Sequence, residues 1–162
     1  MYVVQSEKFY LPAGYIFVSK EIYTIYTVLG SCVAVCLWDR ENYFGGMNHY
    51  IYAKAPAGRS KAIYGDISTR YLIELLLDAG SRPNSLRAHI VGGGVNPARK
   101  SQVGNENILI AEEILKKNKI RIMTRDVGGH TGRKVIFNNS NGNIFVYKIK
   151  HIRRNDWYTY DA

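Results

Sequence analysis

Cys32 is the residue best suited to covalent chemistry in this sequence. It follows Gly30 and Ser31 and precedes an apolar run that begins at Val33. A cysteine at the entrance of a buried strand can act as a nucleophile, because the small residues before it let a substrate approach the backbone. We expect the backbone at Gly30, Ser31 and Val33 to bind the substrate and to stabilise an oxyanion. The alternative is a buried structural cysteine, which is the interpretation that we prefer for Cys36.

A cysteine nucleophile needs a base, and the sequence offers four histidines. His49 follows a Gly-Gly-Met-Asn segment on the strand predicted directly after that of Cys32, and adjacent antiparallel strands bring such side chains within reach of each other. An imidazole in that place takes the thiol proton and favours the thiolate, which we predict to be exposed to solvent. His130, in a Gly-Gly-His-Thr-Gly loop, is the second candidate, while His89 in a strand pattern and His151 near the C-terminus are weaker ones.

Other site chemistries find little support in the sequence. No carboxylate pair and no His/Asp cluster has the spacing of metal ligands, and the two cysteines lack the second ligand pair that a zinc site needs. Gly92 to Gly94 follow a predicted strand but match neither a dinucleotide-binding nor a phosphate-binding loop. We therefore expect no metal and no organic cofactor.

The elements that position Cys32 and His49 are mostly strands. Hydrophobic patterning predicts strands over residues 14–19, 21–29, 33–38, 44–52, 86–91 and 120–127, and a hairpin of 133–137 with 143–149. One helix is predicted to begin at Asp66 or Ser68 and to end at Gly80, and a second to span 105–117. Strands outnumber helices, so an α+β fold with layers of sheet and helix fits best.

Length and charge limit the organisation of the chain and its partners. Its 162 residues fit a single domain over residues 1–150, followed by a basic and aromatic C-terminal tail over 151–162. The net charge of +9 is spread along the chain, which suits an acidic protein partner or a surface that is simply solvated. The 13 tyrosines suggest a nucleic-acid binder, but no matching motif accompanies them, so no nucleic-acid partner is expected.

Two absences in the sequence bear on location. No run of 18 apolar residues occurs, so membrane insertion is not expected, and the N-terminus lacks the pattern of a signal peptide. We expect a cytoplasmic protein whose cysteines are reduced rather than bridged.

Four segments, in order, resemble the CheD family of chemoreceptor glutamine deamidases. Leu29 to Val35 resembles the nucleophile motif of the family, and Gly45 to His49 resembles its catalytic histidine motif, with the expected spacing of seventeen positions between Cys32 and His49. Ile90 to Gly94 resembles the central glycine segment, and Asp126 to Arg133 resembles the D-x-G-G…R motif.

The resemblance implies a fold and an activity. The fold would be a layered α/β/β sandwich similar to the catalytic domain of the cytotoxic necrotizing factor toxins. The activity would be hydrolysis of glutamine amides on chemotaxis receptors to glutamate and ammonia, through a cysteine thioester and without a cofactor. The third catalytic residue of the family is a threonine five or six positions before the cysteine, which implies Thr27, with Tyr26 at the alternative position. The implied partners are methyl-accepting chemotaxis receptors and a CheC-type phosphatase.

Two alternatives remain open from the sequence. The protein could be a non-catalytic adaptor that binds a CheC-type phosphatase or a receptor, or the same Cys/His pair could hydrolyse glutamate methyl esters, since esters and amides pass through similar tetrahedral states.

Overall fold

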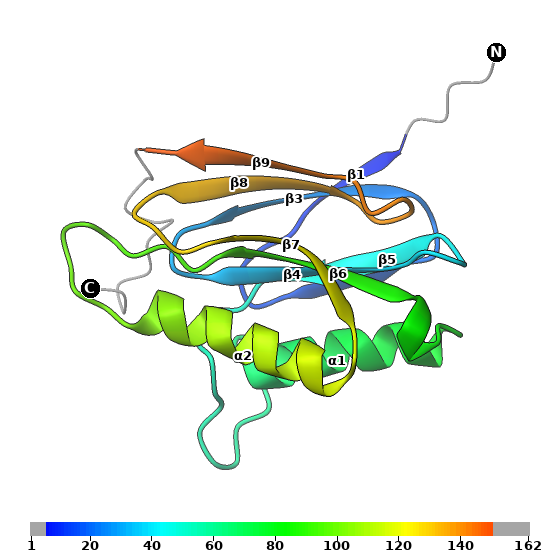
Figure 1. Cartoon of the computed structure of the whole chain (residues 1–162), viewed down its shortest axis with the longest axis horizontal. Coiled ribbons are helices and arrows are strands. Elements are labelled where there is room, and N and C mark those ends of the chain that lie inside the picture. The colour runs from blue at the N-terminus through cyan, green and yellow to red at the C-terminus, as the bar shows by residue number, and fades with distance from the viewer. Residues whose placement is uncertain (1–5, 151–162) are drawn as a thin grey trace.

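The computed structural model describes residues 6–150, which form two β-sheets and two long helices (Figure 1). Segments rich in β-branched and aromatic residues form the strands, as their propensity favours. A 3₁₀ turn at Pro83–Ser85 leads into β6. The elements are β1 (Glu7–Tyr10), β2 (Ile16–Ser19), β3 (Tyr23–Leu29), β4 (Val33–Asp39), β5 (Phe44–Asn48), α1 (Gly65–Asp78), β6 (Leu86–Gly92), α2 (Val103–Lys117), β7 (Arg121–Val127), β8 (Gly132–Asn138) and β9 (Ile144–Ile149).

The five-stranded sheet has the order β2-β5-β4-β6-β7, with β4 at its centre. Strand β4 is antiparallel to both β5 and β6, and all seven of its residues are buried. A strand covered on both faces has no need for polar residues in alternation, which explains the apolar run in the sequence. Strands β6 and β7 are parallel, and α2 connects them.

The four-stranded sheet has the order β1-β3-β8-β9. Strand β3 pairs antiparallel with β8 on one side and parallel with β1 on the other. Strands β8 and β9 form the predicted hairpin, which turns through residues 139–143.

Three layers result from the way these elements pack (Figure 1). One core joins the helices to the five-stranded sheet, and it takes Val33, Val35 and Leu37 from β4. A second core joins the two sheets, and it takes Cys32, Ala34 and Cys36 from the opposite face of the same segment. The α+β class is confirmed, with helices and two sheets stacked as α/β/β layers. The similarity to the toxin catalytic domain stays a prediction.

Several predicted boundaries are wrong for reasons of tertiary structure. Strand β1 was not predicted, because a strand of four residues at a sheet edge has little pattern. Helix α1 has Tyr64 at its N-cap position without a side-chain cap, so the predicted caps Asp66 and Ser68 lie inside the helix. Its first N–H groups bond instead to the carbonyls of residues 52 and 53, which makes a capping side chain unnecessary.

Two further predictions from the sequence concern the C-terminal tail and insertion into a membrane. The basic and aromatic tail at 151–162, together with His151, lies outside the described residues. Among residues 6–150, no helix is long and apolar enough to cross a membrane.

Candidate functional site

Cys32 lies in the short connection between β3 and β4, and a glycine segment packs against this connection. The carbonyl of Gly30 accepts a hydrogen bond from the N–H of Gly94, at 3.0 Å, and the carbonyl of Cys32 accepts one from the N–H of Gly93, at 2.9 Å. Gly92 has a φ of +110°, and a Cβ atom on Gly92 would overlap the carbonyl oxygen of Cys32. The glycines that follow β6 therefore permit a close backbone contact with the Cys32 connection.

The register of β4 and β5 places Cys32 and His49 on one face of the sheet. Val33 forms an isolated antiparallel bridge with Tyr50, in continuation of the pairing of the two strands. Side chains alternate along each strand, so Cys32 and His49 both lie opposite to the face of Val33 and Tyr50. They are diagonal neighbours, a relation that separates Cα atoms by roughly 7–8 Å and lets long side chains meet.

Thr27 reaches the same place from the other sheet. Its hydroxyl lies 2.7 Å from Nδ1 of His49 and donates a hydrogen bond to the carbonyl of Leu11, at 2.9 Å. A hydroxyl has one hydrogen to donate, so Thr27 accepts a hydrogen bond from Nδ1–H of His49. Nε2 of His49 is then the nitrogen without a proton. This atom is buried and has no hydrogen-bond partner within the described part of the chain.

Burial sets the charge of these groups. It lowers the pKa of His49 to about 4, so the ring is neutral near pH 7 and can accept a proton. Burial raises the pKa of the Cys36 thiol far above its ordinary value, which keeps that sulfur protonated. Within residues 6–150, neither cysteine forms a disulfide.

The thiol of Cys32 is less accessible than the sequence suggested. Cys32 is 1% exposed and His49 is 3% exposed. The expectation of a solvent-exposed sulfur is wrong, because this face of β4 packs against the four-stranded sheet and Cys32 belongs to the core between the two sheets.

Backbone N–H groups near Cys32 differ in availability. The N–H of Val33 donates to the carbonyl of Tyr50, at 3.2 Å, so this predicted oxyanion donor already has an acceptor. Outside the strand ladders, no backbone carbonyl of residues 6–150 accepts a hydrogen bond from the N–H of Gly30 or Ser31. These two residues immediately precede Cys32, and we expect their N–H groups to be the more available of the predicted donors.

The remaining candidates from the sequence lie elsewhere. His130 is exposed, and its Nδ1 lies 3.3 Å from the carbonyl of Val95. His89 is buried against Trp38, and its Nε2 lies 2.7 Å from the carbonyl of residue 142. Tyr26 stacks on Tyr10, on the opposite face of β3 from Thr27. The structure thus brings Thr27, rather than Tyr26, to the histidine.

The D-x-G-G…R segment forms a loop that hydrogen bonds hold next to the glycine segment. Arg133 is 2% exposed, and its Nε donates to a carboxylate oxygen of Asp126, at 2.9 Å. Its Nη2 donates to the carbonyl of Gly128, at 2.7 Å, and the N–H of Gly128 donates to the carbonyl of Gly92, at 3.0 Å. This motif therefore stabilises the loop that packs on the Cys32 connection.

Sequence reasoning missed two buried asparagines beside the site. Asn48 accepts a hydrogen bond from the N–H of Val35, at 2.7 Å, and donates to the hydroxyl of Thr69, at 3.2 Å. Asn107 on α2 donates to the carbonyl of Ser31. The signal for Asn107 was present in the sequence, since it is a polar residue at helical spacing from buried residues 110, 111 and 114.

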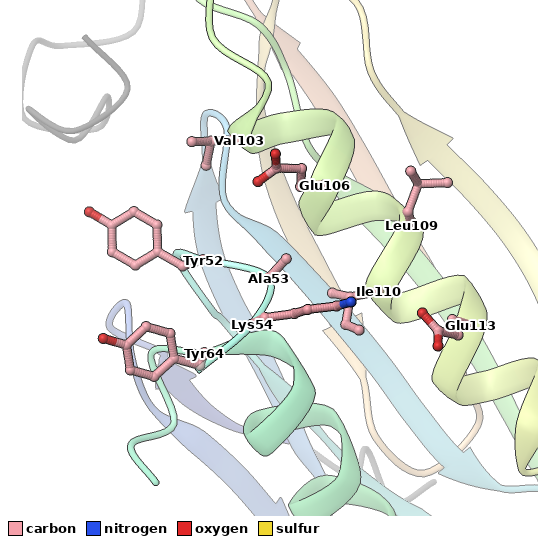
Figure 2. A pocket seen from close by; sticks show the side chains of 9 residues that line it. All are labelled: Tyr52, Ala53, Lys54, Tyr64, Val103, Glu106, Leu109, Ile110 and Glu113. Atoms are coloured by element: carbon pink, nitrogen blue, oxygen red, sulfur yellow. The ribbon is translucent and has the colours of Figure 1, made fainter. Parts of the chain in front are cut away.

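A surface pocket of about 630 Å³ lies between α2 and the segment that follows β5 (Figure 2). Lys54 and Tyr64 line it from one side, and Glu106, Leu109 and Glu113 line it from α2. Neither Cys32 nor His49 lines this pocket, so it is separate from the Thr27–His49 pair.

Comparison with known proteins identifies relatives over nearly the whole chain. The sequence model of the family described as "CheD chemotactic sensory transduction" matches residues 52–148, more than half of the chain. A protein of Anaeromyxobacter dehalogenans, named "Probable chemoreceptor glutamine deamidase CheD 1", is 39% identical over 143 residues, which cover 86% of this chain and 84% of the relative.

Two further relatives carry the name "Probable chemoreceptor glutamine deamidase CheD". That of Sulfurimonas denitrificans is 33% identical over 95% of this chain and 100% of its own length. That of Trichlorobacter lovleyi is 37% identical over 88% of this chain and 91% of its own length. An alignment over 95% of the chain includes Thr27, Cys32 and His49, which precede the segment matched by the family model. With this coverage, and with the family segments packed around Cys32, the chain belongs to the CheD family.

Proposed function

We propose that this protein deamidates glutamine side chains of chemoreceptors, with Cys32 as nucleophile, His49 as base and Thr27 as the residue that orients the base. The names of the relatives support the reaction and its substrate. One observation supports the residues: Thr27 accepts a hydrogen bond from Nδ1–H of His49, which leaves Nε2 without a proton on the face of the sheet that carries Cys32.

The reaction begins with a proton transfer. Nε2 of His49 takes the proton of the Cys32 thiol, and the thiolate attacks the side-chain carbonyl carbon of the glutamine, where a C–S bond forms. The imidazolium returns its proton to the nitrogen of the tetrahedral intermediate. The C–N bond then breaks and ammonia leaves, with a thioester at Cys32.

The second half of the reaction repeats these roles with water as the nucleophile. His49 takes a proton from a water molecule that attacks the thioester. The C–S bond then breaks, and the imidazolium returns this proton to the departing sulfur, which gives the carboxyl group of glutamate and the Cys32 thiol. The neutral state of His49, which follows from its depressed pKa, is the state that both proton abstractions require.

The backbone supplies the oxyanion donors. In this proposal, the N–H groups of Gly30 and Ser31 bind the oxyanion of each tetrahedral intermediate, whereas the N–H of Val33 stays bonded to Tyr50. A single donor of this kind contributes roughly 3–4 kcal/mol to the stability of the transition state.

Burial of Cys32 adds a step before the chemistry. A side chain that is 1% exposed meets a protein substrate only after local opening of the surrounding segments. Closure around the bound glutamine then excludes bulk water and strengthens the electrostatic contribution of the N–H groups.

Receptors and a CheC-type phosphatase are the proposed partners, and the cytoplasm is the proposed location. The net charge of +9 supports an acidic protein surface as the target, because opposite charge raises the rate of encounter.

Mass spectrometry of receptor fragments tests the proposed function. Wild-type protein and Cys36→Ala, the matched control on the same face of β4, are expected to convert specific glutamines to glutamate with release of ammonia. Cys32→Ala is expected to release none while it still binds the receptor fragment. Conversion by Cys32→Ala, or no conversion by the wild type, would contradict the proposal, and an adaptor would bind without conversion in all three proteins. Loss of a methyl group from esterified glutamates would identify esterase activity instead.

A further inference from the structure

Asn107 joins the two segments that carry the proposed nucleophile and base. It lies on α2, is completely buried, and its Nδ2 donates to the carbonyl of Ser31, at 3.0 Å, and to the carbonyl of Ile51, at 2.8 Å. The hydroxyl of Tyr50 donates to the backbone carbonyl of Asn107. Ser31 directly precedes Cys32, and Tyr50 and Ile51 follow directly after His49.

These hydrogen bonds lie where the pairing of β4 and β5 ends. Strand β5 ends at Asn48, and beyond it the only strand pairing between the two segments among residues 6–150 is the bridge of Val33 with Tyr50. Beyond that bridge, no ladder hydrogen bond fixes Ser31 relative to Ile51. Asn107 supplies this link by donating to a carbonyl of each segment.

The other half of the Asn107 amide supports the same conclusion. Its Oδ1 is buried and has no hydrogen-bond partner among residues 6–150. A buried polar atom without a partner is unfavourable, and an apolar side chain of similar size would avoid it. The contribution of the amide therefore lies in its two donated hydrogen bonds.

We propose that Asn107 is a positioning residue that holds the Cys32 connection in register with the His49 segment. The consequence for catalysis rests on the function proposed above. Because the proton moves between Cys32 and Nε2 of His49, a small slip of either segment lengthens the transfer distance without disturbing the binding of the receptor. Asn107 thus acts on the rate of the chemical step more than on substrate affinity.

Substitution of Asn107 has a matched control in Asn139. Asn139 is also completely buried, and its Nδ2 donates to the carbonyls of Ser19, Glu21 and Gly45, at 3.0, 3.0 and 3.2 Å. It lies in the turn between β8 and β9. The test compares Asn107→Leu and Asn107→Ser with Asn139→Leu and Asn139→Ser. Thermal melts identify the variants that are folded at the assay temperature.

Two measurements on the folded variants separate positioning from general stability. The first is receptor deamidation, for which we expect kcat to fall about 100-fold in the Asn107 variants, with KM little changed. The second is the alkylation profile, the time course of Cys32 modification by iodoacetamide at constant pH, followed by peptide mass. We expect Cys32 to react more slowly in the Asn107 variants, because the thiol no longer passes its proton to Nε2 of His49, whereas simple loosening of the core would speed the reaction. The folded Asn139 variants should match the wild type in both measurements.

The outcomes decide the proposal. Folded Asn107 variants with the wild-type kcat and alkylation profile would overturn it, as would Asn139 variants that shift to the same extent. Failure of both Asn107 variants to fold would also overturn it, since Asn107 would then serve folding first. If the wild type lacks deamidase activity, the proposed function fails, whereas the alkylation profiles still test the positioning of Cys32 by Asn107.

Discussion

Replacement of Thr27 by valine removes one oxygen atom on which the proposed site depends. Valine has nearly the same shape, so the core between the sheets keeps its packing. Two buried groups lose their partner, namely Nδ1–H of His49 and the carbonyl of Leu11. Each unpaired group costs about 1–3 kcal/mol of folding stability.

The catalytic effect of Thr27→Val follows from the tautomer of His49. In the wild type, the hydrogen bond to Thr27 favours the proton on Nδ1. A buried hydrogen bond of about 1–3 kcal/mol corresponds to a tautomer ratio of roughly 5 to 150. Without it, much of the histidine carries its proton on Nε2 and cannot accept one from Cys32. The shift of the tautomer and the lost orientation of the ring together should lower kcat about 10- to 100-fold, at most the lower limit of the 10²–10⁴ that general acid–base catalysis contributes.

The assay measures ammonia release from a receptor fragment at a temperature where circular dichroism shows the variant to be folded. Thr27→Ser is the matched control, because it keeps the hydroxyl and loses only a methyl group, worth about 1 kcal/mol of stability. Its kcat should stay close to that of the wild type. A folded Thr27→Val protein with wild-type kcat would refute the role of Thr27, and an equal loss in Thr27→Ser would show that packing, not the hydroxyl, matters.

Three further predictions follow from charge and packing. The pKa of His49, about 4 in the folded protein against its ordinary value of 6.5, means that mainly the unfolded chain takes up this proton as the pH falls from 7 to 4.5. Urea unfolding should therefore show about 2.5 kcal/mol less stability at pH 4.5 from this group, and an equal decline in His49→Gln would contradict the assignment. Gly46→Ala should unfold the protein, because its Cβ would overlap the carbonyl of Phe17. In a melting experiment, Gly58→Ala should lower stability by only about 1–2 kcal/mol, because its Cβ would meet no other atom and only the φ of +80° is unfavourable for alanine. With a net charge of +9, deamidation of an intact receptor should slow as salt is added, while deamidation of a short neutral glutamine peptide should not; equal salt dependence would exclude electrostatic steering.

The sequence predicted the elements of the fold well where the pattern is local. The apolar run from Val33, the helix that ends near Gly80 and the hairpin around 139–143 were all placed within a few residues of their positions. The strand predicted over 44–52 is shorter in the structure. It ends at Asn48, because the segment after it turns toward α1 and keeps only one bridge to β4.

The site was harder to predict because its neighbours are distant in sequence. Spacing along adjacent strands was enough to place His49 and Cys32 on one face of the sheet. The choice between Thr27 and Tyr26 required knowledge of which face of β3 meets the other sheet. The burial of Cys32 depends on residues of the other sheet such as Val135 and Phe137, more than 100 positions away, and no local pattern reports such contacts.

The hydrogen bond between Thr27 and His49 crosses from one sheet to the other. Thr27 belongs to the four-stranded sheet, whereas the histidine and the cysteine lie on the segments of the five-stranded sheet. Two sheets that pack through apolar side chains can slide by a fraction of an ångström while every strand remains intact. In the proposed mechanism, activity therefore depends on how the two sheets pack against each other, and we expect mild heat or hydrostatic pressure to abolish turnover before the far-ultraviolet circular dichroism signal of the strands declines.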